Sequence, residues 1–112
     1  MTTINTTVQG GVCGSVTDIR AECEDAQNVS LHITTTCQNI QTLAKALPES
    51  IDAYDELGRG YDGAIWSTAR SSVPKGCAGC VVPAGCFKSM QVAASLALPS
   101  DAAILVEKQH SL

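Results

Sequence analysis

The sequence is poor in basic residues and in aromatic residues. Its 112 residues include seven lysines and arginines against eleven aspartates and glutamates, and the formal net charge is -4. The basic residues are scattered and form no stripe that would neutralise the phosphates of a nucleic acid. Aromatic residues make up 4% of the chain, so the core must be mainly aliphatic. We therefore expect a globular protein without a nucleic-acid partner.

Long hydrophobic runs are absent as well. The longest mostly apolar run, VAASLAL at residues 92–98, is far too short to span a bilayer. The first ten residues, MTTINTTVQG, have neither the basic region nor the apolar region of a signal peptide. These features predict a cytoplasmic protein that does not bind to a membrane.

Signatures of catalysis are also missing. A thiol hydrolase needs a histidine beside its cysteine, but His32 falls on the outer side of a predicted strand and His110 falls in the C-terminal tail. The glycine-rich stretch GRGYDG lacks the Lys-Ser/Thr pair of a P-loop and does not follow a strand. These absences favour a protein that is not an enzyme.

The length predicts a single domain, residues 1–112, that is large enough to bury a core. Alternation of apolar and polar residues predicts three strands, TINTTV, VTDIRAEC and NVSLHITT, joined as an antiparallel meander. Every second residue of these strands is expected to face the core: Ile4, Thr6 and Val8, then Thr17, Ile19, Ala21 and Cys23, then Val29, Leu31 and Ile33.

After the third strand the period changes to that of a helix. Thr35 and Gln38 form a candidate capping box before this helix, and Pro48 ends it. Its apolar residues recur at i, i+3, i+4 and i+7, namely Ile40, Leu43, Ala44 and Leu47.

Two shorter helices follow. In SIDAYDELG, Ser50 is the expected N-cap and Gly58 is the expected C-cap, and DGAIWSTARS predicts a weaker helix. The first of the two has an apolar side and a carboxylate side, which we interpret as buried and solvated respectively: Ile51, Tyr54 and Leu57, and Asp52, Asp55 and Glu56.

The last helix is the longest. Pro83 stands in its first turn, and the helix is expected to run to Leu98, where Pro99 stops it. The final segment AAILVEK then predicts a last strand inserted in the sheet. The expected order is β-β-β-α-α-α-β, an α+β domain with a mainly antiparallel sheet and helices on one face.

Six cysteines in a reducing compartment are more often ligands or redox groups than structural disulfides. Four of them occupy places that stabilise an anion: Cys13 in a glycine-rich turn, Cys37 at the first helix start, and Cys77 and Cys80 before the last helix. Helix N-termini carry unpaired N–H groups and a partial positive charge, and a thiolate is an anion. The four sulfurs converge if the first strand ends at the edge where these helices begin.

The other two cysteines follow core patterns. Cys23 alternates with the inward-facing Ile19 and Ala21, and Cys86 shares a helical stripe with Met90. A free cysteine packs as a small hydrophobic residue, so we expect both to lie in the core. The spacing C-x2-C-x5-C keeps Cys86 as a reserve ligand.

The C-x2-C pair fits zinc, an iron–sulfur cluster or a redox dithiol. Structural zinc sites usually combine two such pairs, whereas iron–sulfur clusters more often accept scattered ligands. We therefore favour an iron–sulfur cluster bound by Cys13, Cys37, Cys77 and Cys80, in a protein that carries clusters or transfers electrons to a protein redox partner. A structural zinc domain and a thiol–disulfide protein that uses Cys77 and Cys80 are the alternatives, and the sequence leaves the oligomeric state open.

Three stretches of the sequence, GGVCGS, TTCQNI and GCVVPAGCFKSMQVAASLALP, the last leading into AAILVEK, resemble an uncharacterised family of small proteins from anaerobic bacteria and archaea. That family carries an Ile-Cys-Gly-Phe loop, a cysteine at the first helix and a Cys-Pro-Val-Pro segment, which correspond to Cys13, Cys37 and Cys80. In that family a histidine stands near the position that corresponds to Cys77. The resemblance implies grouped thiols and an anaerobic setting, but no activity. The chain departs from the family pattern at four positions. Val12 stands where the family has Ile, Ser15 where it has Phe, Val81 where it has Pro, and Cys86 where it has an aliphatic residue.

Overall fold

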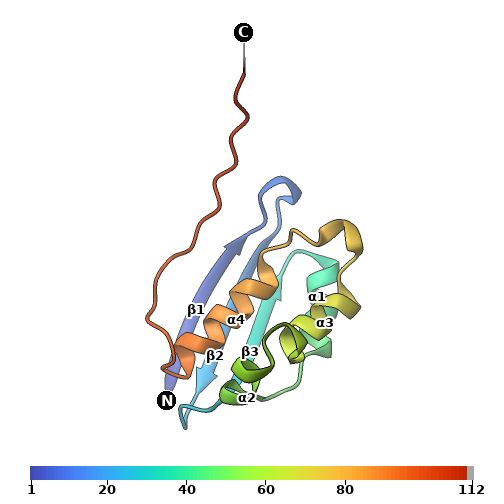
Figure 1. Cartoon of the computed structure of the whole chain (residues 1–112). Helices are drawn as coiled ribbons and strands as arrows, with labels where there is room; N and C mark the ends of the chain where they lie inside the picture. Colours follow the sequence, from blue (N-terminus) through green and yellow to red (C-terminus); the bar gives the residue numbers. More distant parts are fainter. Residues whose placement is uncertain (111–112) are drawn as a thin grey trace.

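An antiparallel sheet with helices on one face forms the protein, seen here in a computed structural model that describes residues 1–110 (Figure 1). The strands lie side by side in the order β1-β2-β3-β4, and each pairs with its neighbour in antiparallel fashion. The expected α+β class is confirmed. The strands are β1 (Thr2–Gln9), β2 (Val16–Cys23), β3 (Asn28–Thr35) and the short β4 (Ile51–Asp52).

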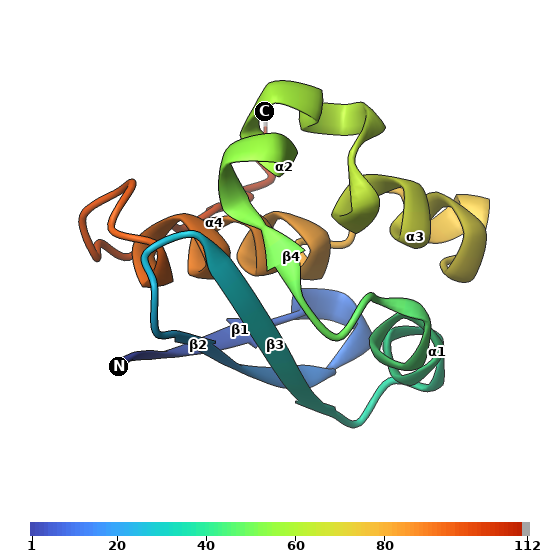
Figure 2. The same ribbon diagram turned by 90° about the horizontal axis from the view of Figure 1, so that it is seen from below.

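The helices gather above one face and one side of the sheet, as Figure 2 shows. Helix α4 lies across β1 and β2, while α1 lies beside β3 and packs against α3. The helices are α1 (Gln38–Ala46), α2 (Ala53–Arg59), α3 (Ala64–Ser72) and α4 (Val82–Ala93), with 3-10 turns η1 (Gly11–Cys13), η2 (Gly60–Asp62) and η3 (Lys75–Cys77).

The alternation of β2 is confirmed at every position. Its inward side chains, Thr17, Ile19, Ala21 and Cys23, are all buried. The side chains between them stay exposed or half-buried, because successive residues of a strand point to opposite faces. The sheet therefore has one face under the helices and one polar face in solvent.

Helix α4 approaches the sheet closely because its inward residues are small. A β-carbon placed at Gly85 would lie 2.8 Å from Cγ2 of Val8 and 3.5 Å from Cδ1 of Ile19. One turn later, the buried hydroxyl of Ser89 lies 2.7 Å from Thr6 Oγ1 and 2.7 Å from the Gly85 carbonyl oxygen. These contacts fix the distance between α4 and β1.

The start of the second helix differs from the expectation. Ile51 pairs with Val29 as part of β4, so the helix begins at Ala53. Asp52, and not Ser50, is the N-cap: its carboxylate accepts hydrogen bonds from the N–H groups of Tyr54 at 3.0 Å and Asp55 at 3.2 Å. An N-cap aspartate satisfies N–H groups that the first turn leaves unpaired.

The faces and the end of α2 also differ. Tyr54 and Leu57 are exposed, and Ala53 and Glu56 are buried in their place. The helix ends at Gly60, which takes a positive φ of 55°, and not at Gly58. The buried side differs because Ile51 is a strand residue, so a helical spacing counted from it does not apply to Tyr54 and Leu57.

The end of the chain is the largest difference. Helix α4 stops at Ala93, the chain turns at Ser95 with a φ of 63°, and residues 97–110 are exposed without a strand. The expected last strand in the sheet is therefore wrong for this single chain. The tail leaves the end of α4, runs in the same general direction as β1 and extends beyond the β1–β2 turn (Figure 1), without forming a strand that pairs with the sheet.

The close approach at Gly85 predicts a strong dependence on side-chain size. We expect Gly85→Leu to lower the free energy of unfolding by about 1–3 kcal/mol, because extra atoms in a packed core force backbone shifts. The matched change Gly58→Leu adds its β-carbon to open space in α2 and should raise stability by up to about 1 kcal/mol through helix propensity. Urea unfolding measures both. Equal effects of the two variants would contradict this account of the packing.

Candidate functional site

Cys13 lies in the tight connection between β1 and β2. The turn is closed by hydrogen bonds from Gly10 N–H to the Ser15 carbonyl at 2.8 Å and from Gly14 N–H to the Gly11 carbonyl at 2.9 Å. The left-handed φ values of Gly11 (77°) and Gly14 (71°) need glycine. A β-carbon at Gly10 would lie 2.5 Å from Cys13 Sγ. The glycines thus form the turn that presents this exposed thiol.

The environment of Cys13 favours the thiolate. The pKa of its thiol is lowered by hydrogen bonding to the Ser15 side chain first, and by the backbone of Ser15 next, against an opposing effect of desolvation. The thiolate is the form that binds metals and attacks disulfides. Cys13 is therefore both accessible and biased toward its reactive form.

Cys37 is the N-cap residue of α1. Its N–H donates to Thr35 Oγ1 at 3.1 Å, and its carbonyl accepts the Gln41 N–H at 2.9 Å. The expected capping box of Thr35 and Gln38 is wrong, because Thr35 still belongs to β3 and shares a hydrogen bond with Thr17 between their hydroxyls. The thiol is half-buried and makes no capping hydrogen bond with the first turn of α1.

Cys77 and Cys80 lie on one turn. The Cys77 N–H donates to the Pro74 carbonyl, and the Cys80 N–H donates to the Cys77 carbonyl, both at 2.9 Å. Cys77 is exposed and Cys80 is half-buried against the core. The turn precedes α4, and Pro83 lies in the first turn of that helix as expected. The C-x2-C pair is thus presented from a hydrogen-bonded loop at a helix start.

The fold brings these three cysteine-bearing segments to one end of the molecule. Figure 1 shows the β1–β2 turn, the start of α1 and the loop before α4 at the same end of the sheet. Val16 and Thr36 join the first two segments: the Val16 N–H donates to Thr36 Oγ1 at 3.3 Å, and the Thr36 N–H to the Val16 carbonyl at 3.4 Å. The contact of Gly85 with Val8 places the start of α4 near the same turn.

The four sulfurs do not form a ready-made coordination sphere. Among residues 1–110, no group of three or more histidine, cysteine, aspartate or glutamate side chains is placed to hold one metal ion. The topology therefore gathers Cys13, Cys37, Cys77 and Cys80 at one end without bringing them to ligand distance of a common centre. All six cysteines are free thiols.

Cys23 and Cys86 lie in the core, as the sequence pattern predicts. Cys23 is buried on the face of the sheet that the helices cover, with its sulfur 3.8 Å from Asp25 Oδ1. Burial raises the pKa of the Cys86 thiol to about 12, and the nearby Cys80 adds to the effect. A ligand role for Cys86 would require a thiolate in this apolar place.

Glu56 is a buried carboxylate that the sequence did not reveal. Its two oxygens accept hydrogen bonds from the N–H groups of Ala64 at 2.9 Å and Ile65 at 2.8 Å, so it caps the start of α3. A β-carbon at Gly63 would lie 2.6 Å from the carboxylate. The interpretation of Glu56 as part of a solvated face is wrong, because these partners come from another helix. The role is structural.

The polar face of the sheet carries paired charges. Glu22 Oε1 lies 2.8 Å from Arg20 Nε and 3.6 Å from His32 Nε2. His32 is exposed on this face, as expected. A shallow depression of about 220 Å³ lies beside these residues and is open to solvent. These side chains are exposed or half-buried, and the face has the character of a solvated surface.

These features define a small α+β domain that presents four thiols from three segments at one end. The chain belongs to a family of unknown function (DUF6951), whose model matches residues 4–106. No curated protein and no solved structure matched the chain. No helix among residues 1–110 is long and apolar enough to cross a membrane.

The environment of Cys13 predicts a pH-dependent reactivity controlled by Ser15. Ser15→Ala removes the side-chain hydrogen bond that lowers the pKa of the Cys13 thiol, so the thiolate fraction at neutral pH should fall. The rate of Cys13 alkylation by iodoacetamide is measured as a function of pH by peptide mass spectrometry. Its pH profile should then shift to higher pH. Ser50→Ala, at an exposed serine outside the turn, is the control and should leave the profile unchanged. An identical profile in Ser15→Ala would contradict the assignment.

Proposed function

We propose that this protein binds an iron–sulfur cluster through Cys13, Cys37, Cys77 and Cys80 and acts in electron transfer or cluster carriage. The observation that supports the proposal is the gathering of three separate cysteine-bearing segments at one end of the sheet (Figure 1). Thiolates are the ligands of these clusters, and clusters accept them from distant parts of a chain.

The two loops that carry exposed thiols have room to close on a cluster. β-carbons at four of their glycines would contact nothing within 4 Å: Gly11, Gly14, Gly76 and Gly79. The free energy of metal binding also drives the ordering of the residues around the metal, so a site that is open without its metal can form on binding. In this proposal the cluster draws the two loops toward the N-cap of α1.

The proposed setting is the cytoplasm of an anaerobe, where exposed clusters survive. The partner is a protein redox partner that docks at the thiol end. The net charge of -4 would steer the protein toward a basic docking surface.

A thiol–disulfide exchange protein is the second candidate, and one observation favours it. Cys77 and Cys80 lie on the same hydrogen-bonded turn, and Cys77 is exposed. A C-x2-C pair in such a place can exchange with a disulfide substrate when its thiolate forms. A structural zinc domain would use the same four thiols without redox chemistry.

Two variants separate ligands from packing cysteines in protein prepared anaerobically. Wild type should contain iron and sulfide and absorb visible light. Cys80→Ala should lose the metal, because it removes a proposed ligand. Cys23→Ala, which deletes a sulfur buried on the face of the sheet that the helices cover, should keep the metal and cost on the order of 1 kcal/mol of stability.

Elemental analysis, visible absorption and urea unfolding decide the outcome. Colourless protein with stoichiometric zinc would replace the cluster with a structural zinc site. Protein without metal that reversibly forms a Cys77–Cys80 disulfide would favour the thiol–disulfide function. Metal lost in Cys23→Ala but kept in Cys80→Ala would overturn the ligand assignment.

A further inference from the structure

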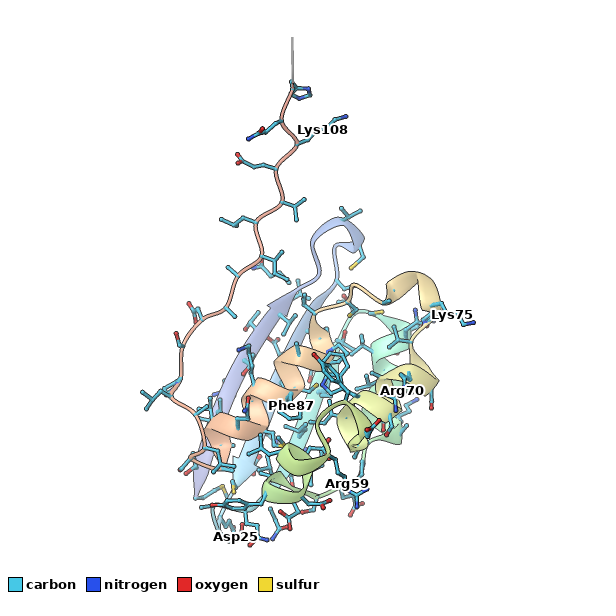
Figure 3. The ribbon with its side chains drawn as sticks, in the orientation of Figure 1. Asp25, Arg59, Arg70, Lys75, Phe87 and Lys108 are labelled. Atoms are coloured by element: carbon cyan, nitrogen blue, oxygen red, sulfur yellow. The ribbon has the colours of Figure 1, made fainter. Side chains whose placement is uncertain are left out.

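The C-terminal tail exposes an apolar segment that has the composition of a strand. Within AAILVEK, Ile104 is 73% exposed, Leu105 is 91% exposed and Val106 is 90% exposed. Three adjacent large aliphatic side chains in water are unfavourable, because each leaves apolar surface exposed that burial would remove from solvent. β-branched residues such as Ile and Val also favour strands. Figure 3 shows Lys108, which follows closely on this segment, standing well away from the body of the protein.

The tail is part of the domain. The family model that matches the chain extends from residue 4 to residue 106, so it includes all three exposed aliphatic residues. A segment that belongs to the shared domain, yet leaves its apolar side chains in solvent, needs a surface to bury them.

The matching surface is the outer edge of β1. This strand is the first in the sheet order, so no strand among residues 1–110 pairs with its outer side. Proteins usually protect such edges with charges, prolines or bulges. The eight residues of β1, TTINTTVQ, include no charge and no proline, and all eight stand in continuous register with β2. The edge is therefore long, regular and open to pairing.

The opposite side of the sheet is not available in the same way. There β3 pairs with the two-residue β4 and is flanked by α1. The β1 edge thus offers the longer continuous backbone for an added strand.

We propose that residues 102–108 of one copy pair as a strand with the outer edge of β1 in a second copy, and that the exchange is reciprocal. Both halves of the interface, an open edge and an unpaired strand segment, belong to the same chain. The tail extends beyond the β1–β2 turn of its own copy and stretches the molecule to 57 × 28 × 25 Å (Figure 1). It therefore reaches a neighbour, and a two-fold exchange closes the assembly.

Side-chain alternation assigns the faces of the added strand. Ile104 and Val106 lie on one side of an extended strand and Leu105 on the other. On β1, Ile4 and Val8 face the helices. Ile104 and Val106 of the second copy continue this apolar row, so they are the residues whose burial stabilises the dimer.

Light scattering after gel filtration, with a thiol reductant present to prevent intermolecular disulfides, tests the proposal on the full chain. Wild type should have twice the 11.6 kDa mass of one chain. The double variant Ile104→Lys/Val106→Lys should be monomeric, because two charges cannot be buried beside β1. Leu98→Lys changes another exposed tail residue, 89% exposed, outside the pairing segment and should remain a dimer.

Hydrogen exchange of the β1 amides gives a second measurement. The amides on the outer edge of β1 should be protected in wild type and should exchange faster in the double variant, while the β2 and β3 amides keep their protection and show that the fold is intact. A monomeric wild type would overturn the proposal, and β1 protection in that monomer would assign the pairing to its own tail. A dimer that survives the double substitution would overturn it as well.

Discussion

The packing of α4 on β1 and β2 determines much of the rest of the structure. It is close because glycine and serine face the sheet: Gly85 lies against Val8, and the Ser89 hydroxyl lies within hydrogen-bond distance of Thr6. A larger residue at position 85 would push the helix off the strand. The same contact positions the loop before α4, and with it Cys80, near the end of β1 where the Cys13 turn begins.

This arrangement places two of the six thiols in the core and four outside it. Cys23 and Cys86 are buried, and burial raises the pKa of Cys86 to about 12, so that thiol stays protonated. Cys13 is exposed, and hydrogen bonding to Ser15 lowers its pKa. Identical side chains thus differ in reactivity because of where the backbone places them. The thiols outside the core share one end of the molecule, which is the reason to seek the function there.

The sheet is open at β1, and the chain carries an unpaired apolar strand segment. In a single copy these two features leave backbone groups and aliphatic side chains in water. Assembly through the tail removes both from water at once, because an added strand supplies the missing hydrogen bonds and its aliphatic side chains extend the apolar row beside α4. The thiol end lies away from the start of the tail (Figure 1).

The sequence by itself determined the features that depend on local pattern. Alternation identified β2 with its buried residues, the proline placed the start of α4, and the spacing of Cys77 and Cys80 put them on one turn. These follow from the period of a strand, the fixed φ of proline and the reach of a four-residue turn.

Only the tertiary structure decided the features that depend on distant partners. Ile51 is a strand residue because Val29 lies opposite it, and Glu56 is buried because the N–H groups of Ala64 and Ile65 need an acceptor. The tail is unpaired because the chain turns after α4 and then runs outside the sheet. In each case the controlling contact joins residues that no local pattern relates, so it exists only once the chain has folded.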